Sequence, residues 1–233
     1  MLHLDQVVLA QDGFRLTADW RIQQGARVAV IGPSGAGKST LLSAIAGFLE
    51  PASGSIRWNG LDLRGVSPGD RPVSILFQDQ NHFPHLSVAQ NLGLGLRPDL
   101  RLSRDEAVRV ALALDRVGLA GLGSRKPAQL SGGQASRAAL ARALLRARPV
   151  LLLDEPFAAL GPALKAEMLA LVAEVAAETG ATVLMVTHEP SDARGFADLV
   201  VLVADGVAQE PVPTADLFAR PSAALADYLG RPK

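Results

Sequence analysis

"RVAVIGPSGAGKST", residues 27 to 40, decides the fold class of this 233-residue chain. The aliphatic run before residue 32 predicts a buried strand, and "KSTLLSAIAGFL", residues 38 to 49, has the apolar spacing of a helix. The glycine-rich loop between them matches G-x-x-x-x-G-K-[ST] in full, and it lies between a strand and a helix, the setting in which that pattern binds phosphate. The stretch therefore predicts a phosphate-binding loop in an α/β fold.

Each part of this loop has a physical reason. Gly32, Gly35 and Gly37 allow the backbone to curl so that N–H groups face phosphate oxygens, next to the positive end of a helix. Lys38 is placed to neutralise β- and γ-phosphate charge, and the Ser39 hydroxyl to ligate Mg²⁺. A glycine turn without a ligand is the alternative. The predicted nucleotide-binding residues are Gly32, Pro33, Ser34, Gly35, Ala36, Gly37, Lys38, Ser39 and Thr40.

The remaining sequence alternates predicted strands and helices. Period-two or aliphatic patterns predict further strands over 2–10, 14–22, 55–60, 72–78, 149–154 and 181–188, then a hairpin over 199–210 and a short helical tail over 214–230. A helix is expected between Pro162 and Gly180. From about 87 to 148 the pattern is helical, with Ser103 and Glu106 as a capping box. We expect a single folding unit over 1–233 with this helical lobe inserted.

Composition excludes several classes of protein. Lys plus Arg and Asp plus Glu both number 23, so net charge gives no argument for nucleic acid or anionic lipid. Cysteine is absent, which excludes disulfides and thiolate zinc sites and suits a reducing cytosol. No apolar run reaches the roughly 20 residues that span a bilayer, and the start does not resemble a signal peptide. The 48% hydrophobic content indicates a large core or a docked partner.

Polar side chains follow several predicted strands. In open α/β sheets the ligand crevice lies outside the carboxyl ends of the strands, so Asp154 and Glu155, after "LLL", should face the phosphate-binding loop. Asp154 suits Mg²⁺ binding, and Glu155 suits orienting and deprotonating an attacking water. His188 and Gln78 end two further predicted strands and should reach the same crevice, His188 near a γ-phosphate and Gln78 near Mg²⁺ and water. Idle, solvated strand ends are the alternative.

The other three histidines carry no such expectation. His3, His82 and His85 have no partner spacing that argues for a metal, and we interpret them as surface or packing residues. The predicted catalytic set is therefore Glu155, His188 and Gln78, and the predicted metal ligands are Ser39, Gln78 and Asp154.

"LSGGQ", residues 130 to 134, is a second glycine-rich turn, although a nucleotide has only one triphosphate. Ser131 and the N–H groups of Gly132 and Gly133 precede a helix expected to begin near Gln134, which makes a second anion site of the same physical kind.

Together these motifs resemble the ATP-binding subunits of ABC transporters. The phosphate-binding loop, Gln78, "LSGGQ", "LLLDEP" and His188 occur in that order over most of the chain, and "LSGGQ" with its flanks is the most specific part. The resemblance implies a P-loop NTPase core with an antiparallel β subdomain and an inserted helical subdomain, and it implies ATP and Mg²⁺ as ligands. It also implies a head-to-tail homodimer in the ATP-bound state. The signature loop that would bind the partner's ATP is Leu130, Ser131, Gly132, Gly133 and Gln134.

Within that family, residues 32–56, 71–100 and 151–172 are similar to the ATPase subunits of bacterial thiamine importers. This implies a peripheral subunit at the cytoplasmic face of the inner membrane, with permease subunits docking near Gln78 to Leu96, apolar contacts from Phe83 and Leu86, and a periplasmic solute-binding protein as an indirect partner. The alternatives are an importer for a polyamine, ferric ion or phosphonate, a soluble ABC ATPase that acts outside transport, and a module that binds ATP without turnover.

The chain departs from the family pattern in three places. Gly161 replaces the usual acid after "AAL", which implies looser coupling between two active sites. "AS" replaces a glutamine and arginine before Arg137. The aromatic residue that stacks on adenine has no counterpart at Gln11; Phe14 is the nearest candidate, although it shares the alternating face of Leu16, as a core residue would.

Overall fold

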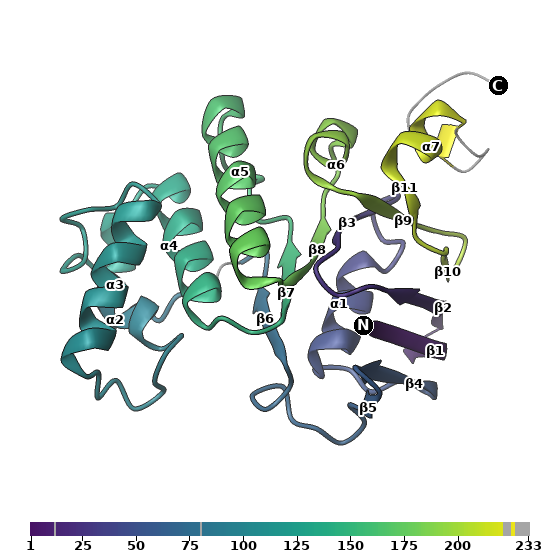
Figure 1. Ribbon diagram of the computed structural model, residues 1–233, viewed down its shortest axis with the longest axis horizontal. Coiled ribbons are helices and arrows are strands. Elements are labelled where there is room, and N and C mark those ends of the chain that lie inside the picture. The colour runs from purple at the N-terminus through teal and green to yellow at the C-terminus, as the bar shows by residue number, and fades with distance from the viewer. Residues whose placement is uncertain (12, 80, 221–224, 227–233) are drawn as a thin grey trace.

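The computed structural model describes residues 1–11, 13–79, 81–220 and 225–226 (Figure 1). Eleven strands of this described part form one mixed sheet in the order β5-β4-β1-β2-β10-β9-β3-β8-β7-β6, with β11 paired to β9. The strands are β1 (Leu2–Gln11), β2 (Phe14–Ile22), β3 (Arg27–Ile31), β4 (Ser53–Trp58), β5 (Leu61–Asp62), β6 (Val73–Leu76), β7 (Val150–Asp154), β8 (Thr182–Val186), β9 (Leu199–Ala204), β10 (Val207–Ala208) and β11 (Val212–Pro213).

The helices pack on both faces of the parallel half of the sheet. They are α1 (Lys38–Ala46), α2 (Val88–Gly93), α3 (Arg104–Arg116), α4 (Gly132–Leu145), α5 (Pro162–Thr179), α6 (Pro190–Phe196) and α7 (Thr214–Ala219), with a 3₁₀ turn at Pro127–Gln129. The sheet separates two hydrophobic cores, and alternate side chains of β7 point into one or the other. Val150 and Leu152 pack with α1, whereas Leu151 and Leu153 pack with α4, α5 and α6. The expected α/β layering is confirmed.

The strand order brings five carboxyl ends to one edge, four of which are followed by loops that carry predicted site residues. β9, β3, β8, β7 and β6 run parallel as neighbours, although they are far apart in the sequence. The first strands, β1, β2, β4 and β5, form the antiparallel part of the same sheet. The loops that follow β3, β6, β7 and β8 therefore leave from neighbouring positions, which is where a crevice forms in open α/β sheets.

The inserted helices α2, α3 and α4 lie together at one end of the molecule, beyond α5 (Figure 1). Ser87, Ser103 and Ser131 each cap one of them, and the expected capping box of Ser103 with Glu106 is present. The expected start of α4 near Gln134 was too late. The helix begins at Gly132, because the Ser131 hydroxyl accepts a hydrogen bond from the Gln134 backbone and so serves as its N-cap.

A buried arginine holds the far end of α1. The Arg71 side chain is 1% exposed, and its guanidinium donates to the backbone oxygens of Ala44 and Ile45 at 2.9 and 3.0 Å. These carbonyls belong to the last turn of the helix, where intrahelical donors run out, although the Ala44 oxygen also accepts the Gly47 N–H at 3.2 Å. Arg71 thereby fixes the helix whose first residue is Lys38.

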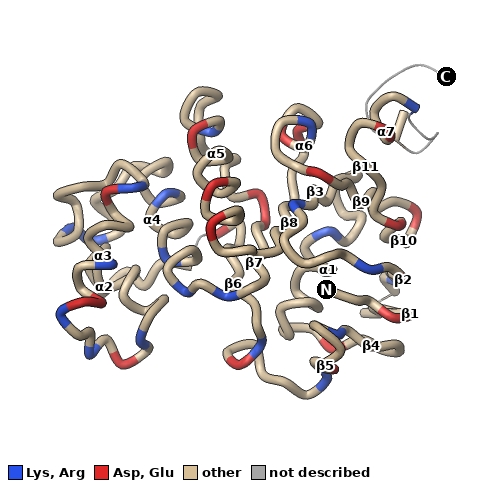
Figure 2. Tube along the Cα trace, viewed as in Figure 1, with Lys and Arg blue, Asp and Glu red and all other residues tan. Residues whose placement is uncertain are grey.

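The remaining boundaries agree closely with expectation. Helix α5 starts at Pro162 and ends at Thr179, with Gly180 as its C-cap in the left-handed conformation, and β9 and β10 form the expected hairpin. Of the expected helical tail, α7 is present, while 221–224 and 227–230 lie outside the described residues. Lys, Arg, Asp and Glu are interspersed along the trace (Figure 2). In the described part of the chain, no helix combines the length and the apolarity that crossing a membrane requires.

Candidate functional site

Half of the predicted site residues line one pocket of about 410 Å³ at the carboxyl edge of the sheet. The loop after β3 supplies the phosphate-binding residues, and the loops after β6, β7 and β8 supply Gln78, Glu155 and His188. The lining residues are Phe14, Ser34, Gly35, Gly37, Lys38, Ser39, Thr40, Gln78, Glu155 and His188. Gln78 and His188 lie two residues beyond their strands, rather than at the strand ends as expected.

The phosphate-binding loop adopts backbone conformations that exclude side chains. At Gly32, φ is +146° and an added Cβ would lie 2.0 Å from the Val203 oxygen. At Gly37, φ is +100° and an added Cβ would lie 2.4 Å from Cζ of Phe14. Glycine is therefore required at both positions. The second contact places the Phe14 ring directly against the loop, while the strand that carries it buries Leu16 on the same face.

Lys38 is almost fully buried and contacts the loop itself. Its Nζ donates to the backbone oxygens of Gly32 and Pro33 at 2.9 and 2.8 Å. Burial lowers the pKa of Lys38, and the negative charges of Glu155 and Asp154 oppose that shift. The loop and the acidic pair after β7 thus act on each other electrostatically, as the strand-end argument predicted.

Asp154 has an unsatisfied oxygen. The residue is 5% exposed, and its Oδ1 has no hydrogen-bond partner among the residues that the structure describes. Burial raises the pKa of Asp154 above its usual range, against a hydrogen bond from Ser39 and the charge of Lys38. A buried, unpartnered carboxylate oxygen beside a serine hydroxyl is a donor set that suits a hard divalent cation. The structure thus places Ser39 and Asp154 together. Ser39 and Gln78 line the pocket, whereas Asp154 lies behind its lining residues.

Glu155 is held in a strained backbone conformation beside His188. Its φ is +47°, which is uncommon for a residue other than glycine, asparagine or aspartate. The Glu155 backbone N–H donates to the Val186 oxygen at 3.2 Å, which ties the loop after β7 to β8. Its Oε1 contacts Nε2 of His188. The Glu155 side chain thus contacts the histidine and lines the pocket.

The signature loop does not line this pocket. Ser131 and Gly132 are exposed, and the helix-capping pair of Ser131 and Gln134 occupies the free end of α4. The exposed N–H groups at the start of α4 retain the anion-binding geometry that the sequence indicated. Ser131 and Gly132 therefore face outward, Leu130 packs against the core, and none of residues 130–134 lines the pocket that the phosphate-binding loop forms.

Four residues that the sequence analysis missed surround the histidine. Lys165 in α5 donates to Glu189 at 2.5 Å and contacts Asp192 at 3.4 Å. Asp192 also accepts a hydrogen bond from the Thr187 hydroxyl at 2.9 Å. The sequence held one signal: Lys165 lies three residues before Met168, on the buried face of α5. A lysine on that face needs a partner.

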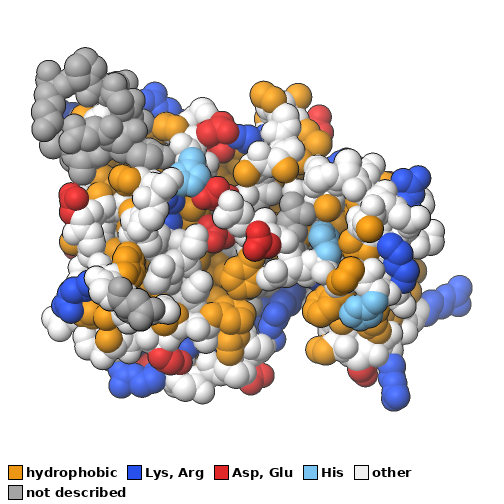
Figure 3. Space-filling view, turned by 180° about the vertical axis from the view of Figure 1, so that it is seen from behind, with side chains coloured by type: hydrophobic (Ala, Val, Ile, Leu, Met, Phe, Trp, Pro, Cys, Tyr) orange, Lys and Arg blue, Asp and Glu red, His pale blue; other side chains and the backbone are white. Residues whose placement is uncertain are grey.

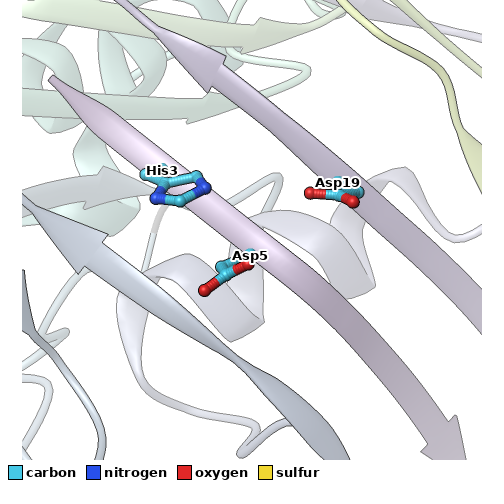
Figure 4. A group of neighbouring side chains, drawn as sticks. All are labelled: His3, Asp5 and Asp19. Atoms are coloured by element: carbon cyan, nitrogen blue, oxygen red, sulfur yellow. The ribbon is translucent and has the colours of Figure 1, made fainter.

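The other histidines lie outside this pocket. His82 Nε2 lies 2.8 Å from the Ala135 oxygen, and burial lowers its pKa, in keeping with a packing role. His3 is grouped with Asp5 and Asp19 on the outer face of β1 and β2 (Figure 4). Asp19 comes from the neighbouring strand, so the sequence spacing did not reveal this group. Asp5 forms an ion pair with Arg57 at 3.5 Å, which partly neutralises the charge of the Asp5 carboxylate.

Comparisons with known proteins identify the family of this chain. The family described as ABC transporter matches residues 17–158. Proteins named thiamine import ATP-binding protein ThiQ are similar over nearly the whole chain. The one from Cereibacter sphaeroides is 68% identical over 99% of this chain and 100% of its own length. The one from Yersinia pestis is 50% identical over 99% of this chain and 97% of its own length.

Solved structures agree as well. The dimeric post-hydrolysis structure of the ATP-binding cassette MJ0796 bound to ADP and Pi has a TM-score of 0.82 and 28% identity, over 92% of this chain and 99% of that one. The shared fold, the motif order and the full-length similarity point the same way. The chain therefore belongs to the ABC transporter family and is related over nearly its whole length to the thiamine import ATP-binding proteins.

Proposed function

We propose that this chain is the ATP-hydrolysing subunit that energises a membrane importer for thiamine or its phosphates. The observation that carries the chemistry is the single pocket in which the phosphate-binding loop meets Glu155, His188 and Gln78. The observation that supports the solute is 68% identity over full length to a protein named for thiamine import. The solute itself would be handled by other subunits, since this pocket is built for a triphosphate.

The phosphate-binding loop would hold ATP by its backbone N–H groups and the start of α1. Phosphoryl transfer needs chiefly positioning and stabilisation of charge. Lys38, now bonded to Gly32 and Pro33, would turn to the β- and γ-phosphates, where its charge is needed. The Phe14 ring against Gly37 is the candidate surface for adenine.

Glu155 would orient the attacking water and accept its proton. Its carboxylate reaches the pocket beside His188, which is placed to bind the γ-phosphate and to hold Glu155 in position. Ser39, Asp154 and Gln78 would hold Mg²⁺, which supplies charge neutralisation at the phosphates. The unpartnered Oδ1 of Asp154 supports this assignment.

A second copy of the chain would complete the site. Residues 130–134 do not line the pocket of their own chain, yet they present helix-start N–H groups to solvent. In a head-to-tail homodimer with ATP bound, they would face the partner's γ-phosphate, so that each nucleotide joins the two chains. The dimeric cassette with the same fold supports this arrangement. Hydrolysis would then release the dimer.

The permease would dock on an apolar surface near Gln78 to Leu96. Phe83 is 47% exposed and Phe48 is 58% exposed, and the Phe48 ring packs edge-on against Phe77 at 5.3 Å. The fully buried Asn91 bonds both backbone groups of Phe83 at 2.8 and 3.0 Å, so the phenyl ring is presented from a fixed segment. Leu86 is only partly exposed. Hydrophobic side chains gather over the boundary between core and helical lobe (Figure 3).

The remaining features follow from that assembly. We place the chain as one domain over 1–233, with 87–148 inserted in the core. It would lie peripherally at the cytoplasmic face of the inner membrane, contact a periplasmic solute-binding protein only through the permease, and act without nucleic acid.

Uptake of labelled thiamine tests this function. Cells that lack the chain are supplied with the native protein or with Glu155→Gln, and uptake of a labelled polyamine is followed in parallel. We expect uptake of thiamine to return only with the native protein. Thiamine uptake that persists without the chain, in cells with no second thiamine route, would remove the solute assignment.

A further inference from the structure

Lys165 places a positive charge where both burial and the helix dipole disfavour it. Its side chain is 11% exposed, and it lies in the first turn of α5, where the helix dipole disfavours a cation. Burial by itself would lower the pKa of Lys165, but the hydrogen bond to Glu189 and the charge of Asp192 outweigh it and raise the pKa. Lys165 therefore stays charged and is held between two carboxylates.

The two carboxylates belong to the segment that carries His188. Glu189 is the residue after His188, and Asp192 accepts from the hydroxyl of Thr187, the residue before it. The Thr187 oxygen in turn accepts the Glu189 backbone N–H at 3.1 Å. Glu189 is thus bound to the Lys165 ammonium directly, and Thr187 is linked to it through Asp192.

A small cavity separates this network from the carboxylate of the pocket. It has a volume of about 130 Å³ and is lined by Glu155 and His188 together with Lys165, Thr187, Glu189 and Asp192. The Thr187 backbone N–H donates to the Val30 oxygen at 3.3 Å, and the ion-pair network adds a second restraint on the segment that carries His188. Loss of the ammonium would leave two adjacent carboxylates to repel each other.

We propose that Lys165 is a positioning residue for ATP hydrolysis, which fixes the Thr187–Glu189 segment so that the His188 side chain meets Glu155. This inference rests on the proposed function. Lys165 does not line the pocket that holds the phosphate-binding loop, so it acts through His188 rather than on the nucleotide. Its effect should fall on kcat and leave nucleotide binding nearly unchanged.

The test compares phosphate release by the purified full chain with Mg²⁺ and ATP. We expect Lys165→Met to lower kcat on the order of ten- to hundredfold, the cost of a small misplacement, with KM nearly unchanged. Lys165→Arg should recover most of kcat. The matched control is Arg116→Met, because Arg116 also binds two carboxylates, Glu174 and Glu178, on the far end of α5, and it should leave kcat unchanged.

A double-mutant cycle distinguishes positioning from a general loss of structure. In the His188→Ala background, Lys165→Met should cause little further loss of kcat, since its effect passes through the histidine. Losses that simply add, or a rise in KM that matches the fall in kcat, would overturn the inference. So would unchanged turnover of Lys165→Met beside an active native chain. No turnover by the native chain would instead overturn the proposed function and the inference with it.

Discussion

The buried arginine under α1 gives the sharpest prediction about stability. Arg71 Nη1 donates to the Ala44 and Ile45 oxygens, and Nε donates to the Val66 oxygen at 3.0 Å. Hydrogen bonds to a charged group contribute about 1.5–3 kcal/mol each, and stranded buried acceptors keep their desolvation cost. Because some carbonyls can regain water and Ala44 keeps its bond from Gly47, we expect Arg71→Met to cost about 3–5 kcal/mol, less than the sum of the three hydrogen bonds.

The melting temperature checks this value. For a chain of this size, each kcal/mol shifts Tm by about 2–4 °C, so Arg71→Met should lower Tm on the order of 10 °C. Arg97→Met is the control, because Arg97 is 49% exposed and its ion pair with Asp99 measures 3.5 Å; it should change stability by about 0.5 kcal/mol or less. A Tm for Arg71→Met within about 2 °C of the native value would refute the reasoning.

Three further predictions concern the site. Asp154→Asn should raise Tm at neutral pH, because burial raises the folded pKa of Asp154 and its charged form therefore disfavours folding. As pH falls through that raised pKa to the unfolded value near 3.8, the Tm values of the variant and the native protein should converge. A pH series of melting curves without this convergence would contradict burial as the cause. Gly161→Asp should stabilise the chain by a few tenths of a kcal/mol, because Gly161 has the extended conformation of an N-cap. An added Cβ there meets no atom of the described residues within 4 Å. A lower free energy of unfolding in denaturant would contradict this. Phe14→Ala should weaken ATP binding by about 1–3 kcal/mol if the ring stacks on adenine, and an unchanged affinity in titration calorimetry would remove Phe14 from the site.

The sequence was informative where local pattern and topology coincide. The strand, loop and helix around Lys38 could be predicted because the motif demands glycine where φ is positive. Asp154, Glu155 and His188 could be grouped because parallel strands share an edge, even though β7 and β8 are separated from β3 by more than a hundred residues. The start of α4 was misplaced because a capping serine before two glycines resembles a loop rather than a helix.

Other features depend on contacts between distant segments. Nothing local indicates that Arg71 reaches the end of α1, or that Lys165 meets Glu189 and Asp192, since these pairs form only once the sheet has brought their elements together. The positive φ of Glu155 is likewise imposed from outside, by the bond of its backbone to β8. Because glutamate disfavours positive φ, the residue type at position 155 gives no signal of this conformation in the sequence.

The most direct test is phosphate release by the purified chain with Mg²⁺ and ATP, for the native protein and for Glu155→Gln, with ATP binding measured on both. The account predicts steady turnover by the native chain and a loss of about a hundredfold or more in Glu155→Gln, with ATP affinity retained, because the amide fills the same space but cannot accept the proton of the attacking water. Equal turnover by the two proteins would contradict the assignment of Glu155 as the base and, with it, the proposed mechanism of the site.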